Sequence, residues 1–127
     1  MAPGVWITAT VALVCYFVSA PAEARSQTKF SGIAAYYDTN YKGRTAHGER
    51  YDPNKFTAAH RTLPFGTRLR VTDLKSHRSV VVTVNDRGPF TRGRVLDLSL
   101  AAAKALRMTG RGLLKVTAAA FTPGEKP

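Results

Sequence analysis

One segment restricts the fold of this chain more than any other: residues 79–85, SVVVTVN, in which valines recur at every second position. Val80, Val82 and Val84 fall on one face of an extended chain, and the residues between them fall on the other. This pattern predicts a strand whose all-valine face lies in the interior of the protein. We therefore expect this segment to be the strongest strand of the chain.

A second segment alternates in a similar way. Residues 67–72, TRLRVT, place Leu69 and Val71 on one face and two arginines on the other, which predicts a half-buried strand. The polar residues 73–78 that separate the two strands predict a hairpin connection. Strand-forming residues also fill three further segments, at 30–37, 56–59 and 113–121.

One helix is expected after these strands. Ser99 is a good N-cap, and the helix that it begins is predicted to run to Met108, with Thr109 and Gly110 as its stop. Residues 38–53, by contrast, are polar and predict a long loop, and such loops in compact domains are more often functional than merely connecting. Several short strands, one helix and long loops predict a mainly β fold, a small β-barrel.

Length and composition limit the class of protein. With 127 residues, the chain has room for one domain of ordinary size, which excludes a multidomain enzyme. It is 44% hydrophobic and 21% charged, which is typical of a globular protein. Its 19 Lys and Arg against 8 Asp and Glu give a net charge of +11, which predicts an acidic partner or simply opposes self-association. A nucleic-acid partner would rest on this charge alone, and we expect none.

The N-terminus has the features of an export signal. Residues 5–18 form an apolar run of 14, shorter than the roughly 20 residues of a membrane-spanning helix. Ala22-Glu23-Ala24 follows as a small-x-small cleavage motif. A buried N-terminal helix is the alternative. We expect a cleavable signal peptide at 1–24, a polar lead-in at 25–29, the barrel at 30–121 and a tail at 122–127.

Removal of the signal would also remove Cys15, the one cysteine of the chain. No disulfide, thiol nucleophile or cysteine-based metal site would then be available to the mature protein. The bulky Val14 before Cys15 argues against a lipid anchor. We therefore expect an exported protein of the periplasm or cell envelope, soluble and without stable membrane insertion.

Among the remaining acids and histidines, Asp86 has the strongest physical case for chemistry. The alternation of residues 79–85 continues onto Asp86 and places it on the valine face, at the mouth of a barrel. A carboxyl group that is partly desolvated in this way suits a general acid. The alternative is a plain turn, because Asp-Arg-Gly-Pro contains the residues that turns favour.

Three other candidates each have a structural alternative. Glu49 lies in the long polar loop, where a solvated surface acid is the alternative. His60 follows a short apolar segment, and it could instead close a turn. Asp97 lies two residues before the helix N-cap, where interaction with the helix N-terminus is the alternative to catalysis. His47, Glu49 and His60 do not have the spacing of a recognised zinc site, so no metal is expected.

Aromatic and basic residues surround these candidates. Four tyrosines flank the loop region, and rings with polar tips suit stacking on sugars, although half-buried packing is the commoner explanation. Arg87 lies beside Asp86 in a basic cluster, for which a solvated rim is the alternative. The candidate sugar-binding residues are Tyr36, Tyr37 and Arg87.

Four motifs occur in order: TAHGERY at 45–51, TAAHRTLPFGT at 57–67, VNDRGPF at 84–90 and GRVLDLS at 93–99. Together they resemble the RlpA family, the "rare lipoprotein A" lytic transglycosylases of the bacterial cell wall. The resemblance spans roughly residues 31–120. It implies a six-stranded double-psi β-barrel with one short helix, an architecture related to expansins.

By motif, the resemblance implies functional roles for Glu49, His60 and Asp86, with no cofactor. Asp97 resembles a carboxylate that expansin-like barrels keep near this helix and is a secondary candidate. His47 stands where the family often has serine, and the first strand lacks the family's tryptophan. Many members also continue into a C-terminal glycan-binding domain that this sequence does not include. We therefore infer no division-site partner from the resemblance.

The resemblance implies cleavage of the MurNAc–GlcNAc β-1,4 bond of peptidoglycan glycan strands, with formation of 1,6-anhydro ends. In this hypothesis Asp86 acts as acid and then as base, Glu49 tunes its charge or stabilises the developing cation, and His60 orients one of the two. The alternative is a non-catalytic expansin-like module that binds or loosens the wall.

Overall fold

The structure is a computed structural model that describes residues 3–4, 9–16, 28–122 and 124–126. Most of the expected signal peptide and its cleavage motif, the lead-in up to residue 27, and Pro123 and Pro127 of the expected tail therefore lie outside the described residues. In the part of the chain that the structure describes, no helix is long and apolar enough to span a membrane.

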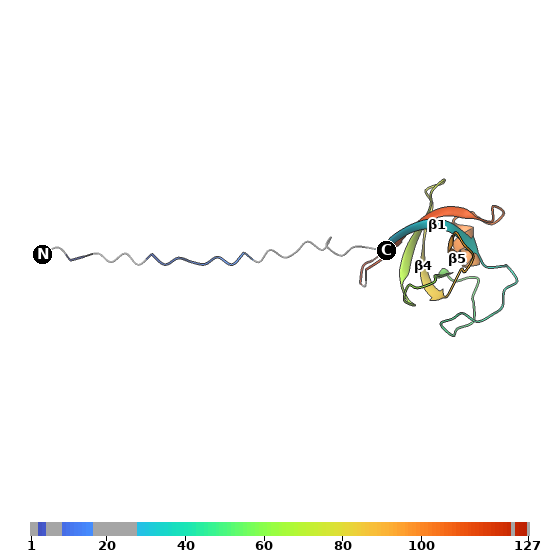
Figure 1. Cartoon of the computed structure of the whole chain (residues 1–127), viewed down its shortest axis with the longest axis horizontal. Coiled ribbons are helices and arrows are strands. Elements are labelled where there is room, and N and C mark those ends of the chain that lie inside the picture. Colours follow the sequence, from blue (N-terminus) through green and yellow to red (C-terminus); the bar gives the residue numbers. More distant parts are fainter. Residues whose placement is uncertain (1–2, 5–8, 17–27, 123, 127) are drawn as a thin grey trace.

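The described chain forms a closed barrel of six strands with one short helix, as expected (Figure 1). Around the barrel the strands follow one another in the order β1-β5-β2-β4-β3-β6. Their bounds are Lys29–Tyr36 for β1, Thr57–Ala59 for β2, Arg68–Asp73 for β3, Ser79–Asp86 for β4, Arg94–Leu98 for β5 and Leu114–Ala120 for β6, and the helix α1 is Leu100–Ala105.

Strands of both orientations close this barrel. β1 pairs in parallel with β5, and β2 pairs in parallel with β4, while the other four neighbouring pairs are antiparallel. Because a parallel pair needs a crossover connection, the chain crosses the barrel ends twice instead of running up and down. These crossings bring segments that are distant in sequence to one end of β4.

The valine face of β4 fills the core, as predicted. Val80, Val82 and Val84 are buried, and Leu69 and Val71 of β3 lie opposite them across the antiparallel pair. Burying these side chains removes them from water, which contributes about 1.5–3 kcal/mol for each. The strands predicted at 30–37, 56–59, 67–72, 79–85 and 113–121 and the hairpin at 73–78 are confirmed, with ends that differ by no more than one residue.

Strand β5 is not among the strands predicted from single segments. Only Leu96 and Leu98 of its five residues are buried, so the apolar alternation is too short to stand out. The sixth strand was implied only by the family resemblance. It matters for the site, because Asp97 lies within it rather than in a loop before the helix.

Helix α1 begins as predicted but ends earlier. The Ser99 hydroxyl accepts a hydrogen bond from the Ala102 N–H, so Ser99 is the N-cap. At the other end, Arg107 has φ 54° and the Met108 N–H donates to the Ala103 carbonyl, which is the hydrogen bond of a Schellman motif. The predicted extension to Met108 is therefore wrong. The left-handed residue that ends the helix is usually a glycine, which a sequence reveals, but here it is an arginine.

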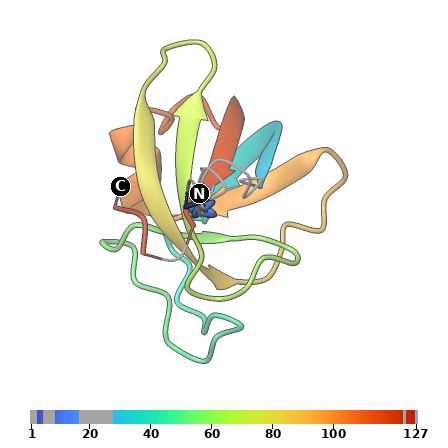
Figure 2. The ribbon, with the colours of Figure 1, turned by 90° about the vertical axis from the view of Figure 1, so that its left-hand side faces the viewer.

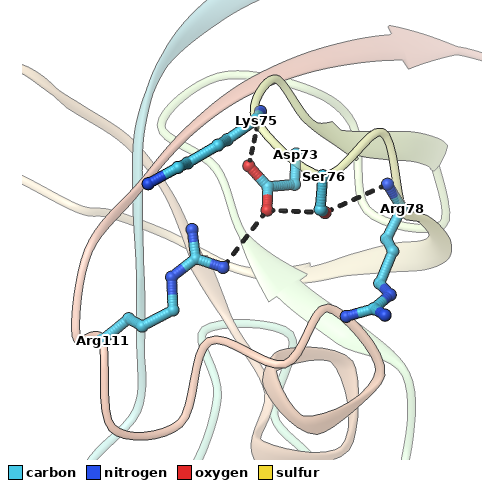
Figure 3. Close-up of polar contacts among 5 residues, drawn as sticks. All are labelled: Asp73, Lys75, Ser76, Arg78 and Arg111. Carbon is cyan, nitrogen blue, oxygen red and sulfur yellow. Dashed lines mark hydrogen bonds and ion pairs between the residues drawn. The ribbon is translucent and has the colours of Figure 1, made fainter.

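Two connections project from opposite ends of the barrel (Figure 2). One is the long segment between β1 and β2, and the other is the β3–β4 hairpin. The hairpin encloses Asp73, whose carboxylate accepts hydrogen bonds from the Lys75 N–H at 3.0 Å and the Ser76 hydroxyl at 2.8 Å (Figure 3). Arg111 reaches the same carboxylate at 3.5 Å from the loop before β6. This buried acid thus joins the β3–β4 hairpin to the loop before β6.

Candidate active site

A row of four residues crosses neighbouring strands and contains both central acids. Ala35 of β1 pairs with Asp97 of β5, Asp97 pairs with Ala59 of β2, and Ala59 pairs with Asp86 of β4. Paired residues on adjacent strands point to the same face of a sheet. The two carboxylates are therefore separated by one strand, whose residue in the row is the buried Ala59.

A register shift in β4 directs Asp86 onto this row. Ala58 pairs with Val84, but the next residue, Ala59, pairs with Asp86, so Asn85 is the extra residue of a bulge. Asp86 therefore shares the face of Ala59, on the side away from the valines. The prediction that Asp86 continues the valine face is wrong for this reason, since a strict period of two assumes an unbroken ladder.

The Asp86 carboxylate accepts three hydrogen bonds. Its Oδ1 accepts from the Ala46 N–H and from the Arg87 N–H, each at 2.8 Å. Its Oδ2 accepts from the Tyr37 hydroxyl. The side chain is half-buried, and its donors come from three parts of the chain: the residue after β1, the long loop and its own neighbour. Such a set of donors fixes the orientation of the Asp86 carboxyl group.

Tyr37 links the acid to a group of stacked tyrosines. Its ring lies 4.5 Å from that of Tyr51 and 5.3 Å from that of Tyr41, measured between centroids. The Tyr51 hydroxyl in turn accepts a hydrogen bond from the Leu100 N–H at the start of α1. Burial, the hydrogen bond to Asp86 and the nearby charge of Asp97 all raise the pKa of Tyr37. The phenol therefore stays protonated and remains a donor at neutral pH.

Asp97 is the second acid of the site. Burial raises its pKa, the charge of Arg94 lowers it, and the charge of Asp86 raises it again, with a net upward shift. Asp97 thus retains its proton to a higher pH than an ordinary aspartate. A pocket of about 460 Å³ adjoins this position, lined by Ala35, Tyr36, Tyr37, Asp38, Thr39, Arg94, Gly112 and Leu113.

Glu49 reaches the same end of β4 through Asn85. Its Oε1 accepts a hydrogen bond from the Asn85 side-chain amide at 3.2 Å, while the glutamate itself is exposed. A small hairpin presents it: the Thr45 N–H donates to the Glu49 carbonyl at 2.7 Å, and the His47 N–H donates to the Asn85 carbonyl at 3.1 Å. Glu49 is therefore held by Asn85, the bulge residue that directly precedes Asp86 in the chain.

His60 contacts the site through its backbone. Its N–H donates to the Asp86 carbonyl at 3.1 Å. Its ring Nδ1 accepts from the Thr62 and Leu63 N–H groups at 3.1 and 3.0 Å, and the ring packs on Phe30 at 5.0 Å. Burial and the charges of Arg61 and Arg87 lower its pKa. The side chain thus closes a turn as a neutral imidazole.

Arg87 supports the same turn. Its guanidinium donates to the carbonyls of His60 and Leu63 at 3.2 and 2.7 Å and lies over the Phe65 ring at 3.9 Å. His47 packs against that ring from the loop side, at 5.0 Å. The arginine therefore connects the turn after β2 to the end of β4.

The structure thus brings the segments of Glu49, His60 and Asp86 together at the C-terminal end of β4, with the side chain of His60 turned away to Phe30. Sequence reasoning missed three contributors: the Tyr37 hydroxyl on Asp86, Asn85 as the residue that holds Glu49, and Phe90. Phe90 is 80% exposed on the loop after Asp86, a position that suits stacking. In the described part of the chain, no three His, Cys, Asp or Glu side chains form a group that could hold a metal.

Comparison with known proteins identifies relatives of this chain. The family model described as lytic transglycolase matches residues 29–118. The probable endolytic peptidoglycan transglycosylase RlpA of Nostoc sp. is 59% identical over 90 residues, which are 68% of this chain and 24% of that protein. The endolytic peptidoglycan transglycosylase RlpA of Neisseria meningitidis serogroup A is 47% identical over 96 residues, 75% of this chain and 40% of that protein. The chain therefore spans well under half the length of these relatives.

Solved structures share the barrel. Streptomyces papain inhibitor matches with a TM-score of 0.61 and 26% identity, over 75% of this chain and 96% of its own. Apo expansin of Clavibacter michiganensis matches with a TM-score of 0.61 and 22% identity, over 79% of this chain and 54% of its own, which shows the fold alone. With its family match and its relatives, the chain belongs to the lytic transglycolase family and has the double-psi β-barrel of RlpA-like proteins.

Proposed function

We propose that this chain cleaves the β-1,4 bond between N-acetylmuramic acid and N-acetylglucosamine in peptidoglycan glycan strands and leaves 1,6-anhydro ends. Membership of the lytic transglycolase family and the names of the relatives support this proposal. The observation that carries it is the row that brings Asp86 and Asp97 together, with the Tyr37 hydroxyl donating to Asp86. Such a substrate implies action in the cell envelope, and we propose the periplasm.

The reaction delivers one proton, removes one and consumes no water. Protonation of the glycosidic oxygen lets its bond to C1 of the muramic residue break, so the N-acetylglucosamine end leaves as an alcohol. The C6 hydroxyl then bonds to C1 and loses its proton, which closes the anhydro ring. Asp86 performs both transfers in this proposal: its carboxylic acid donates the first proton and its carboxylate accepts the second, which regenerates it. The three hydrogen bonds to Asp86 hold it in position for both.

Two other acids assist in the proposal. Asp97 is a secondary candidate for the proton donor, because its raised pKa keeps it protonated over a wider pH range. Glu49, held by Asn85, tunes the charge of the site or stabilises the cation that develops at C1. His60 is a positioning residue that shapes the turn bonded to the Asp86 backbone. Tyr36 and Tyr37 line the adjoining pocket and bind sugar. Arg87, the third candidate for sugar binding, donates to the Leu63 carbonyl and holds the turn after β2.

Replacing Asp86 by asparagine tests the proposal. The Asp86→Asn variant keeps an oxygen acceptor but cannot exchange the proton, so we expect cleavage to fall by about 10²–10⁴-fold. Purified glycan strands would be digested and the 1,6-anhydro products measured by mass spectrometry. Asp52→Asn is the matched control, because the Asp52 carboxylate accepts a local bond from the Asn54 N–H that an asparagine side chain can also accept.

Two outcomes would contradict the proposal. Anhydro products at the wild-type rate from Asp86→Asn would remove Asp86 from the chemistry. Tight binding of strands by the wild-type chain without any anhydro product would support instead a non-catalytic module that binds or loosens the wall, a function class compatible with the same barrel.

A further inference from the structure

A groove of about 500 Å³ lies on the barrel wall formed by β1, β6 and β3. Figure 2 faces this wall, with β4, β3, β6 and β1 following one another from left to right. The row of Asp86 and Asp97 instead crosses β5, β2 and β4. The groove is therefore separate from the candidate active site, and nothing in the proposed reaction uses it.

The centre of this wall is a row of hydroxyl groups. Ser31 of β1 pairs with Thr117 of β6, Thr117 pairs with Thr72 of β3, and Thr72 pairs with Ser79 of β4. The hydroxyls of Thr72 and Ser79 are already 2.8 Å apart. With neighbouring strands about 4.8 Å apart, the four hydroxyls span roughly 14 Å, the length of two to three sugar residues.

Cations border the hydroxyl row on both sides. On one side, Lys29 of β1 and Arg70 of β3 both pair with Ala119 of β6, whose small side chain leaves the space between them open. On the other side lies Lys115, two residues before Thr117 on the same face of β6. The Arg70 guanidinium packs over the Phe121 ring at 5.1 Å, which limits its freedom before any ligand arrives.

The groove's chemistry indicates its ligand. None of the residues that line it, Lys29, Phe30, Ser31, Arg70, Thr72, Thr117, Ala118 and Ala119, is acidic. Ser and Thr hydroxyls both donate and accept hydrogen bonds, as sugar hydroxyls do, whereas phosphate oxygens of a nucleic acid only accept. Lys and Arg at the borders pair with carboxylates. The surface therefore complements a sugar chain that carries carboxylates.

We propose that this wall is a second binding surface for a carboxylate-bearing glycan strand, formed by Ser31, Thr72 and Thr117 with Lys29, Arg70 and Lys115 at its borders. It relies on the proposed function only for the identity of the polymer. A glycan strand bound to this surface keeps the barrel on its polymer while the site containing Asp86 acts elsewhere on that polymer. The bound glycan is either the one being cleaved or a neighbouring one in the peptidoglycan.

Binding is tested with full-length chain that carries Asp86→Asn, so that the strands stay intact. We expect Lys29→Gln with Arg70→Gln to weaken binding of long peptide-free strands, whose muramic residues carry free carboxylates, by about tenfold or more. The control pair, Arg92→Gln with Lys104→Gln, removes the same charge from exposed residues away from the groove and should have little effect. Thr117→Val keeps the shape and charge but removes a hydroxyl, so a loss of about threefold is expected.

Two further probes determine the ligand. Amidation of the strand carboxylates should abolish the difference between the groove pair and the control pair. Equal weakening by both pairs, or a groove effect that persists on amidated strands, would overturn the proposal. A groove effect on DNA without one on the glycan would also overturn it and assign the wall to nucleic acid. Melting temperatures of all variants show whether each one is folded.

A second measurement separates this inference from the proposed function. With Asp86 intact, the groove pair should cleave a short soluble glycan fragment at the wild-type rate and long strands more slowly. If even the wild-type chain cleaves no fragment, the proposed function is wrong. The binding measurement then still shows whether the groove binds the glycan. Equal cleavage of long strands by wild type and groove pair, together with equal binding, would overturn the groove alone.

Discussion

At the scale of single residues, His60 shows how a motif position and a chemical role differ. The motif places His60 among the functional residues, but its Nδ1 accepts two backbone N–H groups, and its own N–H is the group that contacts Asp86. A ring nitrogen occupied in this way is the acceptor of a turn. Sequence could predict the two alternatives, catalysis or turn closure, but not choose between them, because the choice depends on where the ring points.

Substitution of His60 distinguishes these roles. Asparagine can accept the N–H two residues ahead in the same way, so we expect His60→Asn to retain most of the glycan-cleaving activity and His60→Ala to lose more of it, with about 1–2 kcal/mol of stability. Activity on glycan strands and urea denaturation measure the two effects. If the imidazole itself transferred protons, His60→Asn would lose about 10²–10⁴-fold in rate, as much as His60→Ala.

At the scale of elements, the bulge in β4 explains where prediction from the sequence succeeded and failed. The alternation of valines correctly predicted which residues fill the core. It could not predict the face of Asp86, because the bulge depends on pairing with β2, whose paired residues lie 26 or 27 positions earlier in the chain. Likewise Asp73, taken from sequence as part of a plain hairpin, is 1% exposed and joined to Arg111. The face of Asp86 and the burial of Asp73 both depend on contacts with residues distant in the chain, which a local sequence pattern does not include.

The hairpin makes a prediction about pH. The Lys75 N–H, the Ser76 hydroxyl and Arg111 lower the pKa of Asp73 more than burial raises it, so its folded-state pKa lies below the ordinary value of about 3.9. Asp73 therefore stabilises the barrel above that value and loses this contribution as the pH falls through its folded-state pKa. We expect Asp73→Asn to lower the free energy of unfolding by about 2 kcal/mol at pH 7 and by less in acid, measured by urea denaturation.

Arg111→Gln is the matched control for this prediction. Arg111 is 42% exposed and 3.5 Å from the carboxylate, so solvent screens its charge and we expect a loss of only about 0.5 kcal/mol. A difference between Asp73→Asn and wild type that stayed constant from pH 7 into acid would show that the charge of Asp73 does not contribute.

At the scale of the whole molecule, the sequence predicted a small β-barrel with one helix, and the family resemblance supplied the sixth strand and its crossings. Strand order could not come from periodicity, because parallel neighbours such as β2 and β4 are separated by a complete strand and two connections. The same crossings gather the candidate site: Tyr37 follows β1, Asp86 ends β4 and Asp97 lies one residue before the end of β5. Motif order in the chain therefore indicated which residues matter, while only the closed topology explains why they meet.

The pairing of β1 with β6 places the two boundaries of the barrel side by side. Lys29 lies beside Ala119, and the Ala120 N–H donates to the Thr28 carbonyl at 2.9 Å. Circular permutation should therefore be tolerated: a short linker from residue 121 to residue 28, with new termini opened between the exposed Thr91 and Arg92, should preserve the melting temperature and glycan cleavage. Loss of folding in such a permutant would mean that the order of synthesis, and not only the final contacts, is required. Because the two boundaries are neighbours, a tether fused at residue 28 and a tether fused at residue 121 leave the barrel from the same place.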